Sequence, residues 1–304
     1  MNNNRASITA IMCGYTRAYH ATHDSPRIFD DFIAAQLYAP EEIGFFDHAM
    51  AGLLNVFDPE TAATISDETE ALRLVMQVHN SSIILGRARF TEDCLEGYIS
   101  KGLTQYVILG AGMDTFSLRR PELTGQLEIF EVDHPATQAN KRERLLKISP
   151  ELPSNLHLVP VNFEKDDLKT ALLQAGFDSS RPAFFSWLGV TYYLERQAIE
   201  NTLQTIASLS SPGSALVFDY SHEDVFKPEK GNRRTKATQE ITRQSGEPLK
   251  TGFDPAKLEV LLHQFGFQTR ENLPPEEIEK RYFSHRDDLY HAFENSYFIH
   301  AVAE

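Results

Sequence analysis

From residue 105 onward, short apolar runs alternate with helical patterns, and this alternation restricts the possible folds more than any other feature of the chain. The runs that we predict to be strands are Tyr106–Leu109, Leu127–Val132, Leu156–Val161, Ala183–Trp187 and Ala215–Tyr220. Helical patterns lie between them, near Pro135–Lys147, Asp166–Gly176 and Arg196–Leu209. Strands that alternate with helices predict a parallel sheet with helices on both faces, and therefore an α/β fold.

Two further apolar runs, Phe267–Arg270 and Tyr297–Val302, are predicted to be the last strands of this sheet. The second of them follows a charged approach with little helical pattern, His285–Asn295. We therefore expect seven strands, mostly parallel, with an antiparallel last strand.

The first hundred residues differ from the rest, because their patterns are helical throughout. In Ala88–Ser100 the apolar residues fall near helical spacing, and Gly102 follows as a stop signal. We expect residues 1–101 to form an N-terminal helical cap region and residues 102–304 to form the core, in one compact unit. The polar stretch 222–252 follows the fifth strand, where open sheets bind ligands, so it is predicted to be either a lid or a solvated loop.

Composition excludes several classes of protein. With 29 Lys+Arg against 43 Asp+Glu, the formal charge of the 304 residues is −14, which argues against a nucleic-acid partner. Apolar stretches are far shorter than the roughly 18 residues of a membrane helix, and Arg17 interrupts the weak apolar run of the N-terminus. The two cysteines, Cys13 and Cys94, give neither a disulfide framework nor a zinc pattern. We expect a cytoplasmic protein without a membrane partner or a bound metal.

The most informative segment is YVILGAGMDT, Tyr106–Thr115, in which a strand ends in Gly110-Ala111-Gly112. Glycines at such a turn let the backbone approach a ligand closely. The next strand ends in Asp133, 21 residues after Gly112, which matches the spacing of a carboxylate that binds ribose hydroxyls. The pairing predicts an adenosine-containing cofactor, and the alternative for the glycines alone is a tight turn.

The position of the third glycine of a dinucleotide fingerprint is occupied by Thr115, and Asp114 precedes it. A carboxylate is repulsive near a pyrophosphate but favourable near a sulfonium or an amino group. This favours S-adenosylmethionine over NAD.

Two runs, LGAGMDTFSLRRPE from Leu109 and FEVDHPATQANKRERL from Phe130, resemble the leucine carboxyl methyltransferase family. The same family is resembled by three further segments, FFSWLGVTYYL, Gly213–Asp219 and the upstream GRARFTEDCLEGYI. The match runs from about Thr9 to the C-terminus. The family includes bacterial O-methyltransferases of polyketide and other small-molecule pathways. The resemblance implies a class I methyltransferase with a Rossmann-like core and S-adenosylmethionine as cofactor.

The resemblance also implies roles for single residues. Arg87, or alternatively Arg89, would contact the methionyl carboxylate of the cofactor, with Arg17 as a second basic contact. The turn Gly110-Ala111-Gly112 would line the methionyl end and Asp133 would hold the ribose. The adenine contacts would be Asn162 and Phe163. Leu188 stands where many relatives carry an acidic residue, and at the cofactor site it would form an apolar wall instead.

The acceptor determines what else the site needs. A carboxylate acceptor is ionised at neutral pH and needs only a positive anchor, for which the basic pair Arg233 and Arg234 of the lid is the candidate. A hydroxyl acceptor needs a base, and His222 is the candidate. Tyr193 is a second catalytic candidate and Tyr192 a substrate contact, although we expect only one of the two tyrosines to face the site.

We interpret the chain as an S-adenosylmethionine-dependent O-methyltransferase that modifies a carboxyl or hydroxyl oxygen of a small molecule, as a monomer or homodimer. Two enzymatic alternatives stay open, a protein C-terminal carboxyl methyltransferase and an NAD-dependent oxidoreductase. The non-enzymatic alternative is a module that binds the cofactor without turnover.

Overall fold

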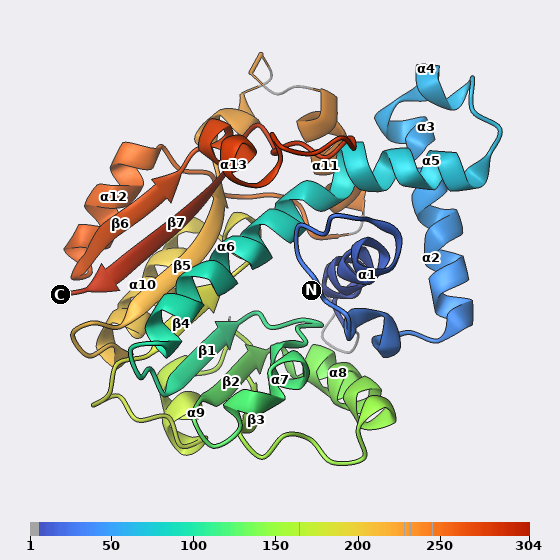
Figure 1. The fold of residues 1–304 in the computed structure, drawn as a ribbon. Coiled ribbons are helices and arrows are strands. Elements are labelled where there is room, and N and C mark those ends of the chain that lie inside the picture. The colour runs from blue at the N-terminus through green and yellow to red at the C-terminus, as the bar shows by residue number, and fades with distance from the viewer. Residues whose placement is uncertain (1–5, 164, 228, 231–232, 245) are drawn as a thin grey trace.

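The computed structural model describes residues 6–163, 165–227, 229–230, 233–244 and 246–304. In this part of the chain one seven-stranded sheet has the order β3-β2-β1-β4-β5-β7-β6 (Figure 1). Its strands are β1 (Gln105–Leu109), β2 (Glu128–Asp133), β3 (Leu156–Pro160), β4 (Phe184–Trp187), β5 (Ala215–Ser221), β6 (Phe267–Leu273) and β7 (Ser296–Ala303). Strand β7 runs antiparallel between β5 and β6, whereas the pairs among β1 to β5 are parallel. The predicted α/β sheet with an antiparallel last strand is confirmed.

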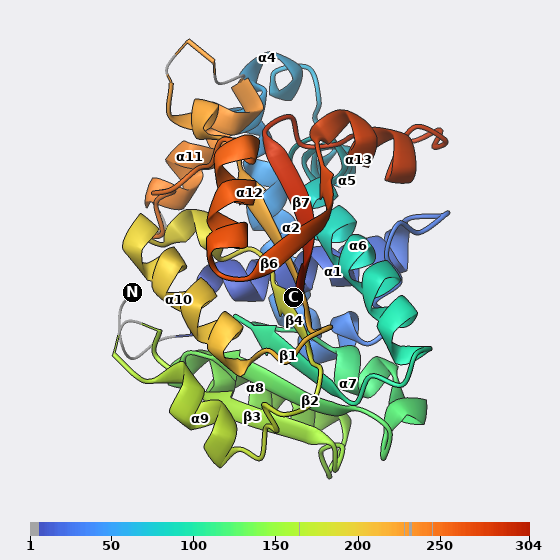
Figure 2. The same cartoon turned by 90° about the vertical axis from the view of Figure 1, so that its left-hand side faces the viewer.

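Helices cover both faces of the sheet, as Figure 2 shows from its edge. The helices are α1 (Ile8–His23), α2 (Pro40–Gly52), α3 (Leu54–Phe57), α4 (Pro59–Ala62), α5 (Glu68–Leu74), α6 (Ser81–Ile99), α7 (Phe116–Arg119), α8 (Pro135–Ile148), α9 (Leu168–Gln174), α10 (Arg196–Leu209), α11 (Arg233–Gln244), α12 (Pro255–Gln264) and α13 (Pro275–Tyr282). Residues of β1, β4 and β5 are buried throughout, because each strand is covered on both sides.

Three hydrophobic clusters hold these layers together. One lies between the sheet and α9, α10 and α12, and a second lies between the opposite face and α6, α7 and α13. The third joins α1, α2, α3 and α5 to α8 and Met113, outside the sheet. Helix α6 packs on β4, β5 and β7 as well as on α1, so it belongs to the sheet's covering layer and also supports the N-terminal helices.

The segment predicted as a lid, 222–252, contains a short 3₁₀ helix (Glu223–Phe226) and α11, which packs against α3. After α11 the chain returns beneath the strand ends, where the Lys250 N–H donates to the Tyr192 carbonyl at 2.7 Å. Thr251 Oγ1 donates to the Leu194 carbonyl at 2.6 Å. The end of the segment therefore lies at the carboxyl edge of the sheet, as its first residue, His222, does directly after β5.

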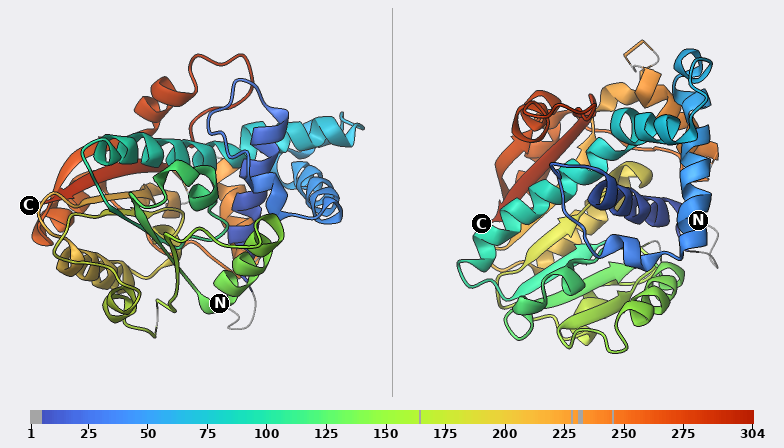
Figure 3. Two further views of the ribbon diagram at one scale, coloured as in Figure 1. Left: turned by 60° about the horizontal axis from the view of Figure 1, so that its bottom comes forward. Right: turned by 45° about the vertical axis from the view of Figure 1, so that its right-hand side comes forward.

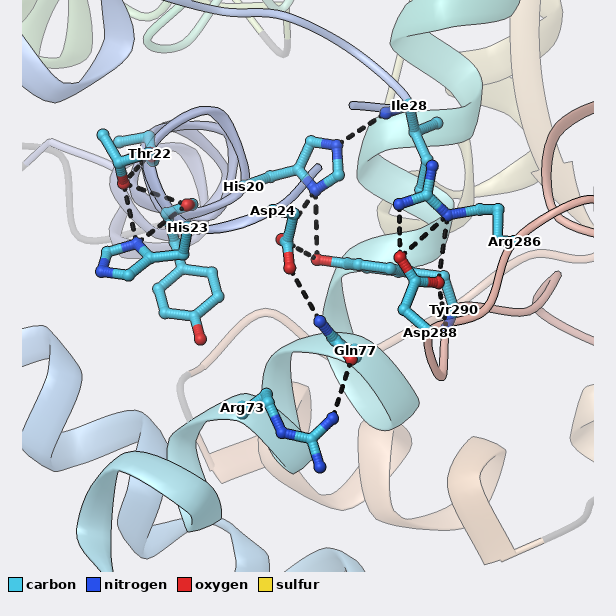
Figure 4. A network of polar contacts seen from close by, with 12 residues as sticks. His20, Thr22, His23, Asp24, Ile28, Arg73, Gln77, Arg286, Asp288 and Tyr290 are labelled. Carbon is cyan, nitrogen blue, oxygen red and sulfur yellow. Dashed lines mark hydrogen bonds and ion pairs between the residues drawn. The ribbon is translucent and has the colours of Figure 1, made fainter. Parts of the chain in front are cut away.

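A buried polar network joins the C-terminal part of the chain to the N-terminal helices (Figure 4). Asp24 accepts hydrogen bonds from His20 Nδ1, Tyr290 Oη and Gln77 Nε2 at 2.7–2.8 Å. His20 Nε2 accepts the Ile28 N–H at 2.8 Å, which assigns the ring proton to Nδ1. The three donors come from α1, from the π-helical turn Val75–Asn80 and from the approach to β7.

Candidate active site

A cavity of about 250 Å³ lies at the carboxyl ends of β1 to β4, beneath the first turns of α1. Figure 3 shows α1 crossing this end of the sheet. The cavity is lined by all nine residues that the sequence analysis places around the cofactor, namely Arg17, Arg87, Gly110, Ala111, Gly112, Asp133, Asn162, Phe163 and Leu188. The carboxyl edge of parallel strands is where open α/β sheets bind ligands.

The glycine turn after β1 and the carboxylate after β2 form one unit. The Gly112 N–H donates to Asp133 Oδ2 and the His134 N–H to Asp133 Oδ1, both at 2.6 Å. Gly110 has φ +72° and Gly112 φ +50°, and a Cβ on Gly110 would lie 2.5 Å from Val190 Cγ2. Burial raises the pKa of Asp133, although the two N–H donors oppose the shift. The turn needs glycine for its conformation and for space, and the carboxylate braces it.

The structure distinguishes the two candidate arginines on α6. Arg87 is buried and lines the cavity, where Nη1 donates to Tyr192 Oη at 2.7 Å and to Asp219 Oδ2 at 3.1 Å. Arg89 lies on the outer face of the helix, paired with Asp93 at 2.7 Å. Arg87 is therefore the arginine that is placed to meet a ligand.

Arg17 also lines the cavity, but much of its hydrogen-bonding capacity is used within the protein. Its Nε donates to Asp31 Oδ2 at 2.8 Å and its Nη2 to the Met113 carbonyl at 2.6 Å. Nη1 donates to the Cys13 carbonyl at 3.4 Å. In this structure Arg17 joins α1 to the loop that follows the glycine turn.

Asp31 is a buried carboxylate that sequence reasoning missed. It accepts hydrogen bonds from Arg17 Nε and, at 2.6 Å, from Thr115 Oγ1, and Arg119 Nε lies 3.4 Å away. Burial raises the pKa of Asp31, but the two guanidinium groups outweigh it, so that the pKa is lowered. Thr115, which replaces the third glycine of the fingerprint, thus ties the cofactor loop to the N-terminal region.

The two adjacent tyrosines after β4 lie in a 3₁₀ turn, Thr191–Tyr193, rather than at a strand end. Tyr193 lines the cavity, whereas Tyr192 stands behind Arg87, and their rings meet nearly edge to face at 4.7 Å. Burial raises the pKa of both hydroxyls. Both phenols are therefore neutral at physiological pH and act as hydrogen-bonding groups.

The other three predicted residues lie outside the cavity wall. His222 caps the 3₁₀ helix that follows β5, because its Nδ1 accepts the Asp224 N–H at 3.1 Å. Arg234 is buried under the approach to β7, where it donates to Ser82 Oγ at 2.6 Å and lies 4.2 Å from the Phe293 ring centroid. Arg233 lies on the outside of α11, 3.5 Å from Asp58.

The cavity is covered by the segment 246–250, which we call the cover segment. Glu247 accepts hydrogen bonds from Ser7 Oγ, of the N-cap of α1, at 3.2 Å and from Thr9 Oγ1 in its first turn. Glu247, Pro248 and Lys250 line the cavity together with Ser7 and Thr9. The residues of this contact are 238 and 240 positions apart in the chain, so local sequence patterns gave no sign of it.

A buried ion pair between Lys141 and Glu131 lies beneath Asp133. Both side chains are fully buried, with Glu131 on the same strand as Asp133 and two residues before it. The Lys141 ammonium acts against the rise that burial causes in the pKa of Asp133. It therefore favours the ionised carboxylate at the cavity wall.

Among the described residues, no group of three or more His, Cys, Asp or Glu side chains is arranged to hold a metal ion. A search of the same residues found no helix with the length and apolarity needed to cross a membrane.

Two solved structures share the arrangement of this chain. A DUF574 family protein of Streptomyces avermitilis superposes with a TM-score of 0.60 at 10% identity, over 100% of this chain and 99% of that one. A protein of Thermobifida fusca with a provisional methyltransferase name gives 0.53 at 15% identity, over 84% and 94%. Both similarities concern the fold.

Comparisons of sequence identify the family as well as the fold. The family model of leucine carboxyl methyltransferase matches residues 10–207. YktD of Bacillus subtilis, provisionally named an S-adenosyl-L-methionine-dependent methyltransferase, is 39% identical over 303 residues, 99% of each chain. Rv3399 of Mycobacterium tuberculosis, named in the same way, is 32% identical over 247 residues, 79% of this chain and 66% of its own. The chain therefore belongs to the leucine carboxyl methyltransferase family and is an S-adenosylmethionine-dependent methyltransferase.

Proposed function

We propose that the protein transfers a methyl group from S-adenosylmethionine to a carboxyl or hydroxyl oxygen of a small molecule. The observation that carries the proposal is that one cavity at the strand ends is lined by all nine residues expected around the cofactor. A protein C-terminal carboxylate is the alternative acceptor.

The chemistry of the cavity wall fits this cofactor. The cavity wall carries a guanidinium, Arg87, that suits a carboxylate, and beside the glycine turn the Asp133 carboxylate, which suits ribose hydroxyls. Leu188, Val161 and Phe163 supply apolar surface and an aromatic face for a base. Arg87 would hold the methionyl carboxylate, Asp133 the ribose, and Asn162 and Phe163 the adenine.

When bound, S-adenosylmethionine supplies an electrophilic methyl group on a cationic sulfonium. The protein would have to hold the acceptor oxygen in line with this methyl group, at about 3–3.5 Å. Attack by an anion on a cation cancels charge in the transition state, so a dry cavity favours the reaction once fixed groups hold the ground state. Residues of α1 and of the cover segment line the cavity, and they would limit the access of water to it.

The position of the cover segment also favours a small molecule as the acceptor. Glu247 bridges to Ser7 and Thr9 above the strand ends, so a folded protein surface does not reach the cavity while these contacts persist. An acceptor that fits beneath the cover has no such difficulty.

A carboxyl acceptor suits the wall better than a hydroxyl. It needs a positive contact and no base, and Lys250 lines the cavity, paired with Glu195 at 3.4 Å. His134 is the imidazole among the described lining residues, and its Nδ1 already accepts the Ala136 N–H at 3.3 Å. We therefore place carboxylic acids first among the acceptors.

The test begins with calorimetric titration of the purified protein with S-adenosylmethionine and with NAD. The protein is then incubated with S-adenosylmethionine and, separately, aliphatic and aromatic acids, phenols and a peptide ending in leucine, and S-adenosylhomocysteine is measured. We expect micromolar binding of S-adenosylmethionine only and turnover with a small acid.

Arg89→Ala serves as the matched control for Arg87→Ala, because the two arginines share a helix but only Arg87 lines the cavity. Loss of binding in Arg87→Ala alone supports the proposed site. If the peptide is methylated and none of the small acceptors is, the substrate is a protein C-terminus. Binding of NAD alone would exclude the proposal.

A further inference from the structure

Asp219 on β5 is a buried residue outside the cavity wall that contacts Arg87 and the loop after β4. It is fully buried and is not part of the cavity lining. Its Oδ2 accepts from Arg87 Nη1 at 3.1 Å and its Oδ1 from the Gly189 N–H at 2.6 Å. Its carbonyl accepts from Thr191 Oγ1 at 2.7 Å.

These three contacts hold the loop after β4 and the arginine in one arrangement. Leu188, Gly189, Val190 and Tyr193 of this loop all line the cavity. A Cβ on Gly189 would lie 2.5 Å from Arg87 Nη2, so the guanidinium sits directly against the loop backbone. Asp219 thus fixes the distance between the loop and the guanidinium.

Asp219 and Tyr192 leave part of the guanidinium available. Both bind Nη1, whereas Nη2 has a long contact of 3.6 Å to Cys13 Sγ, and Nε donates to no described residue. A guanidinium presents five N–H donors in a planar fork, so fixing one end directs the others. A carboxylate that enters the cavity meets an arginine that is already oriented.

We propose that Asp219 is a positioning residue that sets Arg87 for the amino-acid carboxylate of the cofactor, without touching the cofactor itself. The inference rests on the proposed function, since it requires S-adenosylmethionine in this cavity. A buried ion pair is by itself weak evidence for stability. The placement of this one, against a cavity-lining loop, gives it a role in binding.

The test compares two ligands that differ in the amino-acid part. S-adenosylhomocysteine carries the carboxylate, whereas 5′-methylthioadenosine has the same adenosine and sulfur but lacks it. For Asp219→Asn we expect at least a tenfold loss of affinity for S-adenosylhomocysteine and a change within twofold for methylthioadenosine, by calorimetry. Arg87→Met should show the same selectivity, and the double variant should lose no more than Arg87→Met alone.

Two further variants complete the design. Tyr192→Phe removes the other partner of Nη1 while keeping the ring, so we expect a smaller loss that is again selective for S-adenosylhomocysteine. Asp93→Asn, which removes the partner of Arg89, should bind both ligands as the wild type does. Tyr192→Phe keeps the test valid even where Asp219→Asn does not fold.

Equal losses for both ligands, an unchanged affinity for S-adenosylhomocysteine or a gain in it would each overturn the positioning role. A wild-type protein that binds neither ligand would instead contradict the proposed function, and the inference would fall with it.

Discussion

At the level of single residues, the charged groups around the cavity are held in place by other parts of the chain. Asp133 is braced by two backbone N–H groups, Arg87 by Asp219 and Tyr192, and Arg17 by Asp31. Groups that are fixed in advance lose less freedom on binding. These charged groups would therefore lose little side-chain freedom when a ligand binds.

Replacing Asp133 by Asn tests the ribose contact. The amide keeps an oxygen for one backbone N–H but loses the charge, and a hydrogen bond to a charged group contributes about 1.5–3 kcal/mol. We expect a loss of roughly tenfold to a hundredfold in affinity for both S-adenosylhomocysteine and methylthioadenosine, since both contain the ribose. Unchanged affinity for both ligands would remove Asp133 from the ribose site.

The Lys141–Glu131 pair predicts a non-additive change in stability. Lys141→Met leaves the Glu131 carboxylate buried without its partner, which costs about 3–5 kcal/mol of the free energy of unfolding. The double variant Lys141→Met with Glu131→Gln should recover much of this loss. Urea unfolding at pH 7 measures both, and equal stability of the single and double variants would speak against a coupled pair.

Much of the site could be predicted from residue spacing, because the glycine turn and Asp133 lie at fixed distances along two consecutive strands. The contacts of Asp31 and Glu247 could not. Asp31 meets Thr115 across 84 positions, and Glu247 meets Ser7 across 240, so no local period marks either one. The prediction for Arg233 and Arg234 depends on their charge alone, and charge does not determine which way a side chain points from its helix.

At the level of elements, the prediction was most accurate where apolar periodicity was strong. The helix expected at Arg196–Leu209 has those bounds in α10, whose apolar residues pack on the sheet. The sequence analysis does not predict helix α11, because the helix has too few apolar residues to show a periodic pattern. These residues are Ala237 and Ile241, and both are only partly buried. A helix held by so few apolar contacts leaves little pattern in its sequence.

The loop that contains Thr115 makes a prediction at this level. Thr115→Val keeps the shape of the side chain but removes the donor to Asp31, leaving a buried carboxylate with one partner fewer. We expect the free energy of unfolding to fall by about 1–3 kcal/mol, while Thr115→Ser stays close to the wild type. Equal stability of the valine and serine variants in urea would show that the hydroxyl contributes nothing to holding the loop.

At the level of the whole molecule, the network around Asp24 joins segments from both ends of the chain (Figure 4). Burial raises the pKa of Asp24, but hydrogen bonds from His20, Tyr290 and Gln77 outweigh it and hold the pKa below its usual value. A carboxyl whose folded pKa is depressed contributes stability above its unfolded pKa of about 3.9, and loses it as the pH falls through the folded pKa.

Asp24→Asn should therefore be less stable than the wild type at neutral pH, and the difference should shrink as the pH falls below about 4. Urea unfolding of the two proteins between pH 3 and pH 7 measures this difference. Asp93→Asn, on the exposed face of α6, is the control and should show little change. A difference that stays constant down to pH 3 would disagree with the depressed pKa.

The hydrogen bonds from Ser7 and Thr9 to Glu247 affect which step limits the rate of turnover. If the nucleoside product binds beneath these hydrogen bonds, it leaves only after they break, so we expect product departure, and not methyl transfer, to set the steady-state rate. Rapid mixing should then show an initial burst of about one methylated acceptor per enzyme, followed by a slower linear phase. Thr9→Val removes one of the hydrogen bonds to Glu247, so it should increase the rate of the linear phase and leave the burst amplitude unchanged.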